Sequence, residues 1–165
     1  NLHPLLHEAA DDGRVAGNNA ANYPEIHALP RRLPMGIVFT DPNIAFVGLR
    51  GAQVDPLTMC SGEVSYSDQG RARVMHVNQG LLRIHGDRRD STLVGAEMIG
   101  PRMEHVAHLL AWAVQQRMTV EQALAMPFYH PVIEEGVRTA LKDLEHRLRF
   151  APAAGQPCDC LMPGD

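Results

Sequence analysis

The chain has 165 residues and a mass of 18.1 kDa, which is the size of about one ordinary domain. With 45% hydrophobic and 21% charged residues, it has the composition of a globular protein whose core needs no metal or disulfide to stabilise it. The net charge of −4 is too small to predict a nucleic-acid or membrane-surface partner. No run of about 18 apolar residues is present, so the sequence predicts no membrane span.

The start of the chain and its cysteines give weaker indications of its origin and location. The chain begins at Asn1 with no initiator methionine and no secretory leader, so we expect a piece of a longer protein. An odd set of cysteines without metal-ligand spacing, Cys60, Cys158 and Cys160, predicts no disulfide framework and favours a reducing, cytoplasmic location. The last two lie in the Pro/Gly-rich segment 151–165, which we expect to be a disordered tail with incidental thiols; a redox or metal role for the pair is the alternative.

Three segments precede that tail. Residues 1–22 have helical character, with a break expected at Gly13. Residues 23–35 contain three prolines and two arginines, which predicts an extended linker and the most plausible domain boundary. The remaining domain then spans residues 36–150.

Strand patterns come first in that domain. Short apolar or alternating runs predict strands at 37–40, 44–49, 63–67, 71–77, 81–85 and 92–99. A polar turn at 86–91 separates the last two runs, so we expect them to form a hairpin.

The pattern then changes to a helical period. Apolar residues spaced three and four apart predict a helix over 106–117 and another over 137–150. Between them, Thr119 and Gln122 have the spacing of a capping box, so a short helix should begin there and end before Pro127. Strands followed by helices predict an α+β fold: an antiparallel sheet of about four to five strands with helices packed on one face, preceded by a helical segment.

Few motifs point to chemistry. The sequence contains no G-x-G-x-x-G, no P-loop and no G-x-S-x-G, so it has no visible phosphate-binding loop or nucleophile elbow. Two histidine pairs have helical spacing, His3 with His7 and His105 with His108, but neither has the third and fourth ligands that zinc needs. We therefore expect ordinary surface histidines and no metal site.

One constellation is sharper. Pro131 favours an extended conformation for His130, and Glu134 and Glu135 fall in the first turn of the helix that follows. A carboxylate five residues after a histidine can orient the imidazole for acid–base chemistry. On the pattern alone, a helix start beside an incidental histidine is the competing interpretation.

The spacing His130-Pro131-x-x-x-Glu135 resembles the His-Pro-x-x-x-Glu signature of the pyridine nucleotide–disulfide oxidoreductases. The resemblance is to their C-terminal dimerisation domain, most of all in the dihydrolipoamide dehydrogenase branch. It runs from about residue 4 to residue 150 and rests on several stretches taken together: 4–17, 37–42, 44–48, 80–83, 93–100 and 104–108. Two positions depart from the family pattern, because Val132 stands where threonine is usual and Asn43 where glutamate is usual.

The resemblance implies a homodimer in which each subunit supplies a histidine to the active site of the other. His130 would be the general acid/base beside a redox-active cysteine pair, and Glu135 the carboxylate that orients it. The substrate would be a lipoyl-bearing protein or a small dithiol, with no nucleic-acid or membrane partner.

The resemblance also implies cofactors. FAD and NAD would serve the full-length enzyme, with Leu5, Leu6, His7 and Pro131 near the flavin. Residues 1–22 would be the end of the flavin domain, and 36–150 the dimerisation domain. Both cofactor fingerprints and the cysteine pair lie before the matching region in the family, so we expect this chain alone to bind neither cofactor and to be inactive. Two alternatives stay open: the same domain of a glutathione-type disulfide reductase, or a non-catalytic homodimerisation module.

Overall fold

The computed structural model describes residues 5–150 and divides into two units, one ending at Pro34 and one beginning at Met35. In the first unit, helix α1 (Leu6–Ala21) runs without interruption through Gly13, so the expected break is wrong. A single glycine inside a helix costs only about 1 kcal/mol, which lowers stability without ending the helix. Residues 25–34 form neither helix nor strand. The assignment of segments to domains stays a prediction, and its last segment, 151–165, lies outside the described residues.

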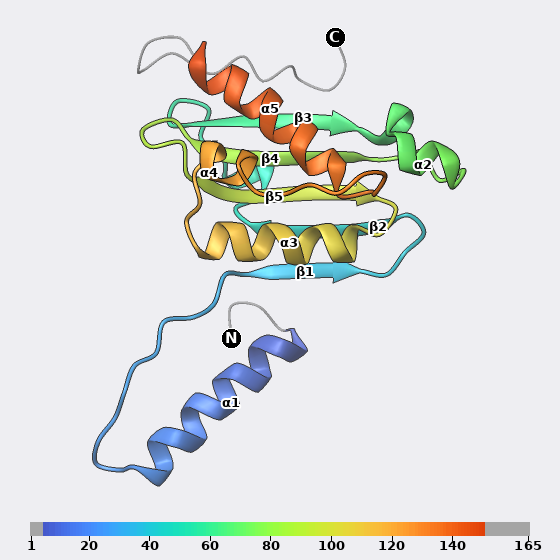
Figure 1. Ribbon diagram of the computed structural model, residues 1–165. Helices are drawn as coiled ribbons and strands as arrows, with labels where there is room; N and C mark the ends of the chain where they lie inside the picture. The colour runs from blue at the N-terminus through green and yellow to red at the C-terminus, as the bar shows by residue number, and fades with distance from the viewer. Residues whose placement is uncertain (1–4, 151–165) are drawn as a thin grey trace. The chain divides into compact units, whose positions relative to one another are not determined.

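The second unit is built on a five-stranded antiparallel sheet (Figure 1). The strands lie in the order β1 (Met35–Val38), β2 (Asn43–Gly48), β5 (Leu93–Gly100), β4 (Leu81–Asp87) and β3 (Met59–Ser65). Every neighbouring pair is antiparallel. This architecture confirms the α+β class, and the pairing of β4 with β5 confirms the hairpin.

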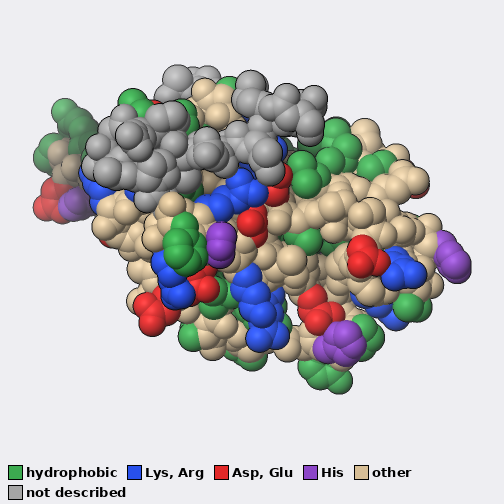
Figure 2. All heavy atoms as spheres, turned by 90° about the horizontal axis from the view of Figure 1, so that it is seen from above, with side chains coloured by type: hydrophobic (Ala, Val, Ile, Leu, Met, Phe, Trp, Pro, Cys, Tyr) green, Lys and Arg blue, Asp and Glu red, His purple; other side chains and the backbone are tan. Residues whose placement is uncertain are grey.

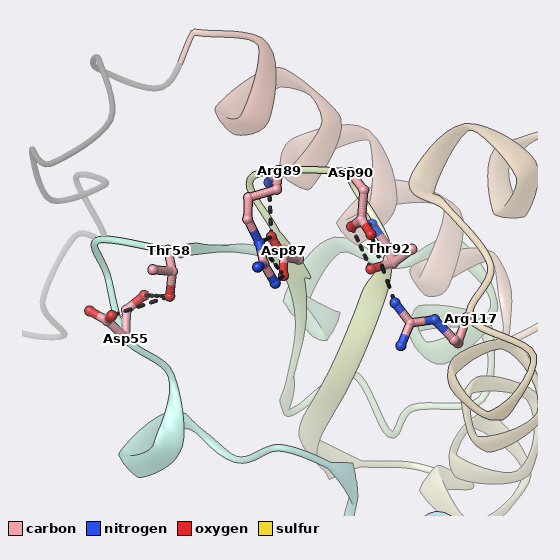
Figure 3. A network of polar contacts seen from close by, with 7 residues as sticks. All are labelled: Asp55, Thr58, Asp87, Arg89, Asp90, Thr92 and Arg117. Atoms are coloured by element: carbon pink, nitrogen blue, oxygen red, sulfur yellow. Dashed lines mark hydrogen bonds and ion pairs between the residues drawn. The ribbon is translucent and has the colours of Figure 1, made fainter.

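Short-range polar contacts close the β4–β5 hairpin (Figure 3). The Arg89 guanidinium donates to Asp87 at 2.6 Å, and Asp90 accepts from both the backbone N–H and the hydroxyl of Thr92. Hydrogen bonds from Arg89 hold the pKa of the Asp87 carboxyl below its usual range. Arg117 reaches the same turn and lies 3.8 Å from Asp90. The charged and hydroxyl groups of the turn are therefore paired with one another.

Three helices cover one face of the sheet: α3 (Met103–Gln115), α4 (Val120–Leu124) and α5 (Glu135–Arg149) (Figure 1). α3 and α5 confirm the two predicted amphipathic helices. The capping box is also confirmed, because Gln122 N–H donates to the Thr119 hydroxyl and Thr119 N–H donates to the Gln122 side chain. The apolar sides of these helices and the strands that face them form the core.

The region predicted as a strand at 71–77 is instead helix α2 (Gly70–Val74), so that prediction is wrong. The alternation of Ala72 and Val74 suggested one buried strand face, but Ala72 is buried and Val74 is 69% exposed. Local hydrogen bonding explains the difference, because the Gln69 side chain accepts from Ala72 N–H and caps the helix.

Cys60 lies fully buried on β3 and is disulfide-bonded, which corrects the expectation of unpaired thiols.

The surface carries mixed charge. In Figure 2, acidic and basic side chains lie next to one another on the face shown. Within residues 5–150, no helix is long and apolar enough to cross a membrane. The same residues contain no group of three or more metal-ligating side chains that could hold an ion.

A histidine is buried in the sheet. His85 on β4 is fully buried, and its Nδ1 lies 2.7 Å from the Ser61 hydroxyl on β3, while its Nε2 has no hydrogen-bond partner. Burial disfavours the imidazolium and lowers the pKa of His85 to about 4. The ring is therefore neutral in the folded protein at neutral pH.

We predict that His85 makes the fold sensitive to mild acid. The unfolded chain binds a proton at the ordinary histidine pKa and the folded chain only near pH 4, so stability is full above ~6.5 and falls as the pH drops towards 4. The expected loss between pH 7 and pH 5 is about 2 kcal/mol. Guanidinium unfolding at several pH values measures it.

The variant His85→Gln should flatten this pH dependence, whatever its absolute stability. His76→Gln, at an exposed position of the same unit, is the matched control and should keep the wild-type slope. A steep slope that persists in His85→Gln would contradict the prediction.

Candidate acid–base site at the start of α5

His130 lies on an irregular loop between α4 and α5, directly before the cis His130–Pro131 peptide. Its Nδ1 lies 2.9 Å and 3.0 Å from the two carboxylate oxygens of Glu135, the first residue of α5. An ionised carboxylate only accepts hydrogen bonds, so Nδ1–H donates and the ring is fixed in one tautomer. Nε2, on the opposite edge of the ring, is then the nitrogen that is not turned toward Glu135. The imidazole is 78% exposed, so this nitrogen is accessible in the described chain.

The carboxylate is held more firmly than the imidazole. Glu135 is only 29% exposed and also accepts from Val132 N–H at 3.1 Å. The hydrogen bond from His130, with this backbone bond, holds the pKa of Glu135 below its usual range. Its place in the first turn of α5 adds the favourable end of the helix dipole. Glu135 is thus a fixed negative charge that orients His130.

The loop that carries His130 is held from the sheet side. Ile133 is buried in the core. The Val132 carbonyl accepts from Gln69 Nε2 at 2.7 Å, and the Tyr66 hydroxyl lies 3.5 Å from the Ile133 carbonyl. Sequence reasoning missed both Tyr66 and Gln69, because the segment was expected to lead into a strand and more than 60 residues separate them from the loop.

A glycine makes this contact possible. Gly136, the second residue of α5, lies against the buried ring of Tyr66, and a Cβ at Gly136 would overlap the hydroxyl group. Burial raises the pKa of the Tyr66 phenol well above its usual range, so the ring stays neutral and its hydroxyl can donate.

An apolar groove of about 570 Å³ lies beside the loop, between α3 and α5. Two large aromatic side chains on its rim are strongly exposed, Trp112 at 76% and Tyr129 at 80%. Leu109 and Met126 add further exposed apolar surface. Because Tyr129 directly precedes His130, the groove and the acid–base pair occupy neighbouring parts of the surface.

The other predicted site residues fall in two places. Pro131 is exposed beside His130, as part of the same turn. Leu5, Leu6 and His7 belong to the first unit, at the start of α1, where Leu6 and His7 are exposed. The structure thus brings together His130, Pro131 and Glu135, and the assignment of roles to all six residues stays a prediction.

Comparison with known proteins identifies the fold and its family. Residues 35–141 match the dimerisation domain of the pyridine nucleotide-disulphide oxidoreductases. The chain belongs to this family. Similar curated proteins include two named dihydrolipoyl dehydrogenase: one from Rhizobium etli, 26% identical over 87% of this chain, and one from Halobacterium salinarum, 30% identical over 89%. These matches cover 30% of each relative, so the chain spans about a third of their length.

Solved structures show the same fold. LpdA from Mycobacterium tuberculosis superimposes with a TM-score of 0.75 at 24% identity, over 86% of this chain and 31% of LpdA. A Cu(II) complex of the HOCl-induced flavoprotein disulfide reductase RclA from Escherichia coli gives 0.71 at 18% identity, over 87% of this chain and 32% of RclA.

We predict that Gly136→Ala destabilises this dimerisation domain. Alanine is the better helix former, but its methyl group would have to displace the buried Tyr66 ring, and overpacking of this kind costs about 1–3 kcal/mol. Chemical unfolding measures the change.

Gly70→Ala, at the start of α2 in the same unit, is the matched control because nothing lies within 4 Å of its added Cβ. It should be neutral or stabilising by up to ~1 kcal/mol. Equal effects of the two alanines would show that Tyr66 does not constrain position 136.

Proposed function

We propose that this chain is the dimerisation domain of a dihydrolipoyl dehydrogenase, and that His130 serves as the acid/base group in the active site of the partner subunit. The observation that carries the proposal is the pair of contacts from His130 Nδ1 to both oxygens of Glu135, at 2.9 and 3.0 Å. An imidazole fixed by a carboxylate on one nitrogen and open on the other has the arrangement that proton transfer requires. The names of the relatives support the same reaction.

The chemistry assigned to His130 is movement of a proton. In dithiol oxidation the substrate loses two electrons and two protons and forms an S–S bond, while a disulfide on the enzyme is reduced. His130 Nε2 would take the proton from the attacking thiol, because the thiolate is the nucleophile in thiol–disulfide exchange. Glu135 would stabilise the imidazolium until the proton is passed on. NAD⁺ finally accepts a hydride, with one proton released.

Pro131 is the residue near the acid–base pair that we assign to the flavin environment. Pro131 lies on an exposed turn, and the sequence has neither glycine fingerprint of a dinucleotide-binding fold. We therefore assign binding of FAD and NAD to the remainder of the full-length enzyme, with Pro131, Leu5, Leu6 and His7 contributing to the flavin environment. When bound, the flavin relays electrons between the reduced cysteine pair and NAD⁺.

A second copy of the chain is the proposed partner within the enzyme. The His130 side chain is 78% exposed within the described residues, so its second ring nitrogen is open to a surface brought by another subunit. The part of the family that residues 35–141 match is its dimerisation domain. The exposed rim of the groove, above all Trp112 and Tyr129, is suited to burial against that subunit, because aromatic side chains dominate interface energetics.

Substrate and location complete the proposal. The reducing substrate would be a lipoyl-bearing protein or a small dithiol. We propose a cytoplasmic location, since the reaction depends on the cellular nicotinamide pool.

In the full-length enzyme, His130→Gln should lower dithiol oxidation by at least ~100-fold while flavin remains bound, because a positioned acid/base typically contributes ~10²–10⁴-fold. Glu135→Gln should have a smaller effect in the same direction, since the imidazole loses its charged partner but keeps both nitrogens. Steady-state turnover and the flavin absorbance spectrum provide the measurements.

His108→Gln, on the exposed side of α3, is the control and should keep wild-type turnover. Near-normal turnover in His130→Gln would remove the catalytic role and leave an oriented surface histidine.

Replacement of Trp112 by glutamate should weaken the dimer, because an interface aromatic of this kind commonly contributes 2 kcal/mol or more, about a 30-fold change in the dissociation constant. Sedimentation of the full-length protein over a dilution series measures the shift. Val74→Glu introduces the same charge at an exposed apolar position outside the groove and should leave the dimer unchanged. Equal dissociation constants for the two variants would place the interface elsewhere.

A further inference from the structure

Gln69 links two segments that are distant in the sequence. Its side-chain Oε1 accepts from Ala72 N–H at 2.7 Å and so caps α2. Its Nε2 donates to the carbonyl of Val132 at 2.7 Å, across a separation of 63 residues. One carboxamide therefore accepts a hydrogen bond from the first turn of α2 and donates one to a carbonyl in the loop that carries His130.

The Val132 residue is held at both of its polar groups. Its carbonyl accepts from Gln69, and its N–H donates to Glu135 Oε2 at 3.1 Å. The same carboxylate accepts from His130 Nδ1. A rotation of the backbone at Val132 would therefore break the bond to Glu135 and move the imidazole with it.

The segment that carries Gln69 is itself held in place by burial and backbone hydrogen bonds. Tyr66, three residues before Gln69, is fully buried, and its backbone N–H donates to the Gly80 carbonyl at 3.0 Å. Asn78 Nδ2 donates to the Ser67 carbonyl at 2.8 Å, which closes the segment around α2. By contrast, Tyr129 and His130 are strongly exposed, so packing does little to fix their part of the loop.

We propose that Gln69 is a positioning residue for His130, acting through the backbone of Val132 and the carboxylate of Glu135. Its catalytic consequence rests on the proposed role of His130. The hydrogen-bonding consequence does not, because it concerns only the protection of the Val132 amide.

Gln69→Glu in the full-length enzyme separates the two functions of the side chain. The carboxylate has nearly the same size and still accepts from Ala72 N–H, so α2 keeps its cap. It has no donor for Val132, and it sets a negative oxygen against the carbonyl. We expect kcat for dithiol oxidation to fall about 10-fold, within the ~100-fold that a displacement of ~1 Å can cost. The KM for NAD⁺ should be unchanged.

Amide hydrogen exchange supplies a readout that is independent of catalysis. In Gln69→Glu, exchange at Val132 N–H should accelerate while the amides of α2 keep wild-type protection. Gln69→Met, which is similar in size and uncharged, should accelerate exchange at Val132 as well and covers the case in which the added charge impairs folding. Gln53→Glu is the matched control, because Gln53 also caps a short helix by accepting a backbone N–H and does not contact the loop.

Wild-type kcat together with wild-type exchange at Val132 in both Gln69 variants would overturn the inference. If His130→Gln keeps full activity, the proposed function fails instead, and the exchange of Val132 alone then decides whether Gln69 positions the loop.

Discussion

The close approach of α5 to strands β3 and β4 is the constraint on which the rest of the second unit depends. A Cβ at Gly62 on β3 would overlap the backbone of α5 at Ala140 and Leu144. On the neighbouring strand, Gly86 lies against the side chain of Leu144, which is itself fully buried. Because these two strand positions have no side chain, α5 packs unusually close to the sheet. At so short a distance, the side chains of α5 interlock with those of the strands, and the helix has little freedom to slide or rotate.

That constraint determines where the candidate site lies. With α5 fixed along its length, its first residue, Glu135, has a defined place at the edge of the core. Three interactions stabilise the ionised carboxylate there: the hydrogen bond from His130, the hydrogen bond from the Val132 amide and the positive end of the helix dipole. A charge held this way can orient an exposed imidazole, although that imidazole has almost no packing of its own. The helix start therefore fixes the carboxylate, while the imidazole that it orients lies on the surface of the described chain.

Much of the fold could be read from local patterns. The amphipathic periods of α3 and α5, the capping box at Thr119 and the polar turn of the β4–β5 hairpin all rest on interactions between residues close in the sequence. The errors arose where local patterns were ambiguous. Alternation at 71–77 suggested a strand, but a side-chain cap from Gln69 and burial of Ala72 favour a helix. Gly13 suggested a break, but one glycine is too weak a perturbation to end a 16-residue helix.

The sequence by itself determined the α+β class, the family resemblance and the His130–Glu135 pair, because a five-residue spacing across a helix start is a local feature. Only the tertiary structure decided what holds that pair in place. Gln69 and Tyr66 reach the loop from a segment more than 60 residues earlier. Position 136 has no room for a side chain because the ring of Tyr66, the residue directly after β3, lies against it. The same holds for the buried state of His85, which lies between two neighbouring strands and pairs with Ser61 on one and Gly95 on the other. Such contacts depend on how distant segments pack, and no periodicity along the chain encodes them.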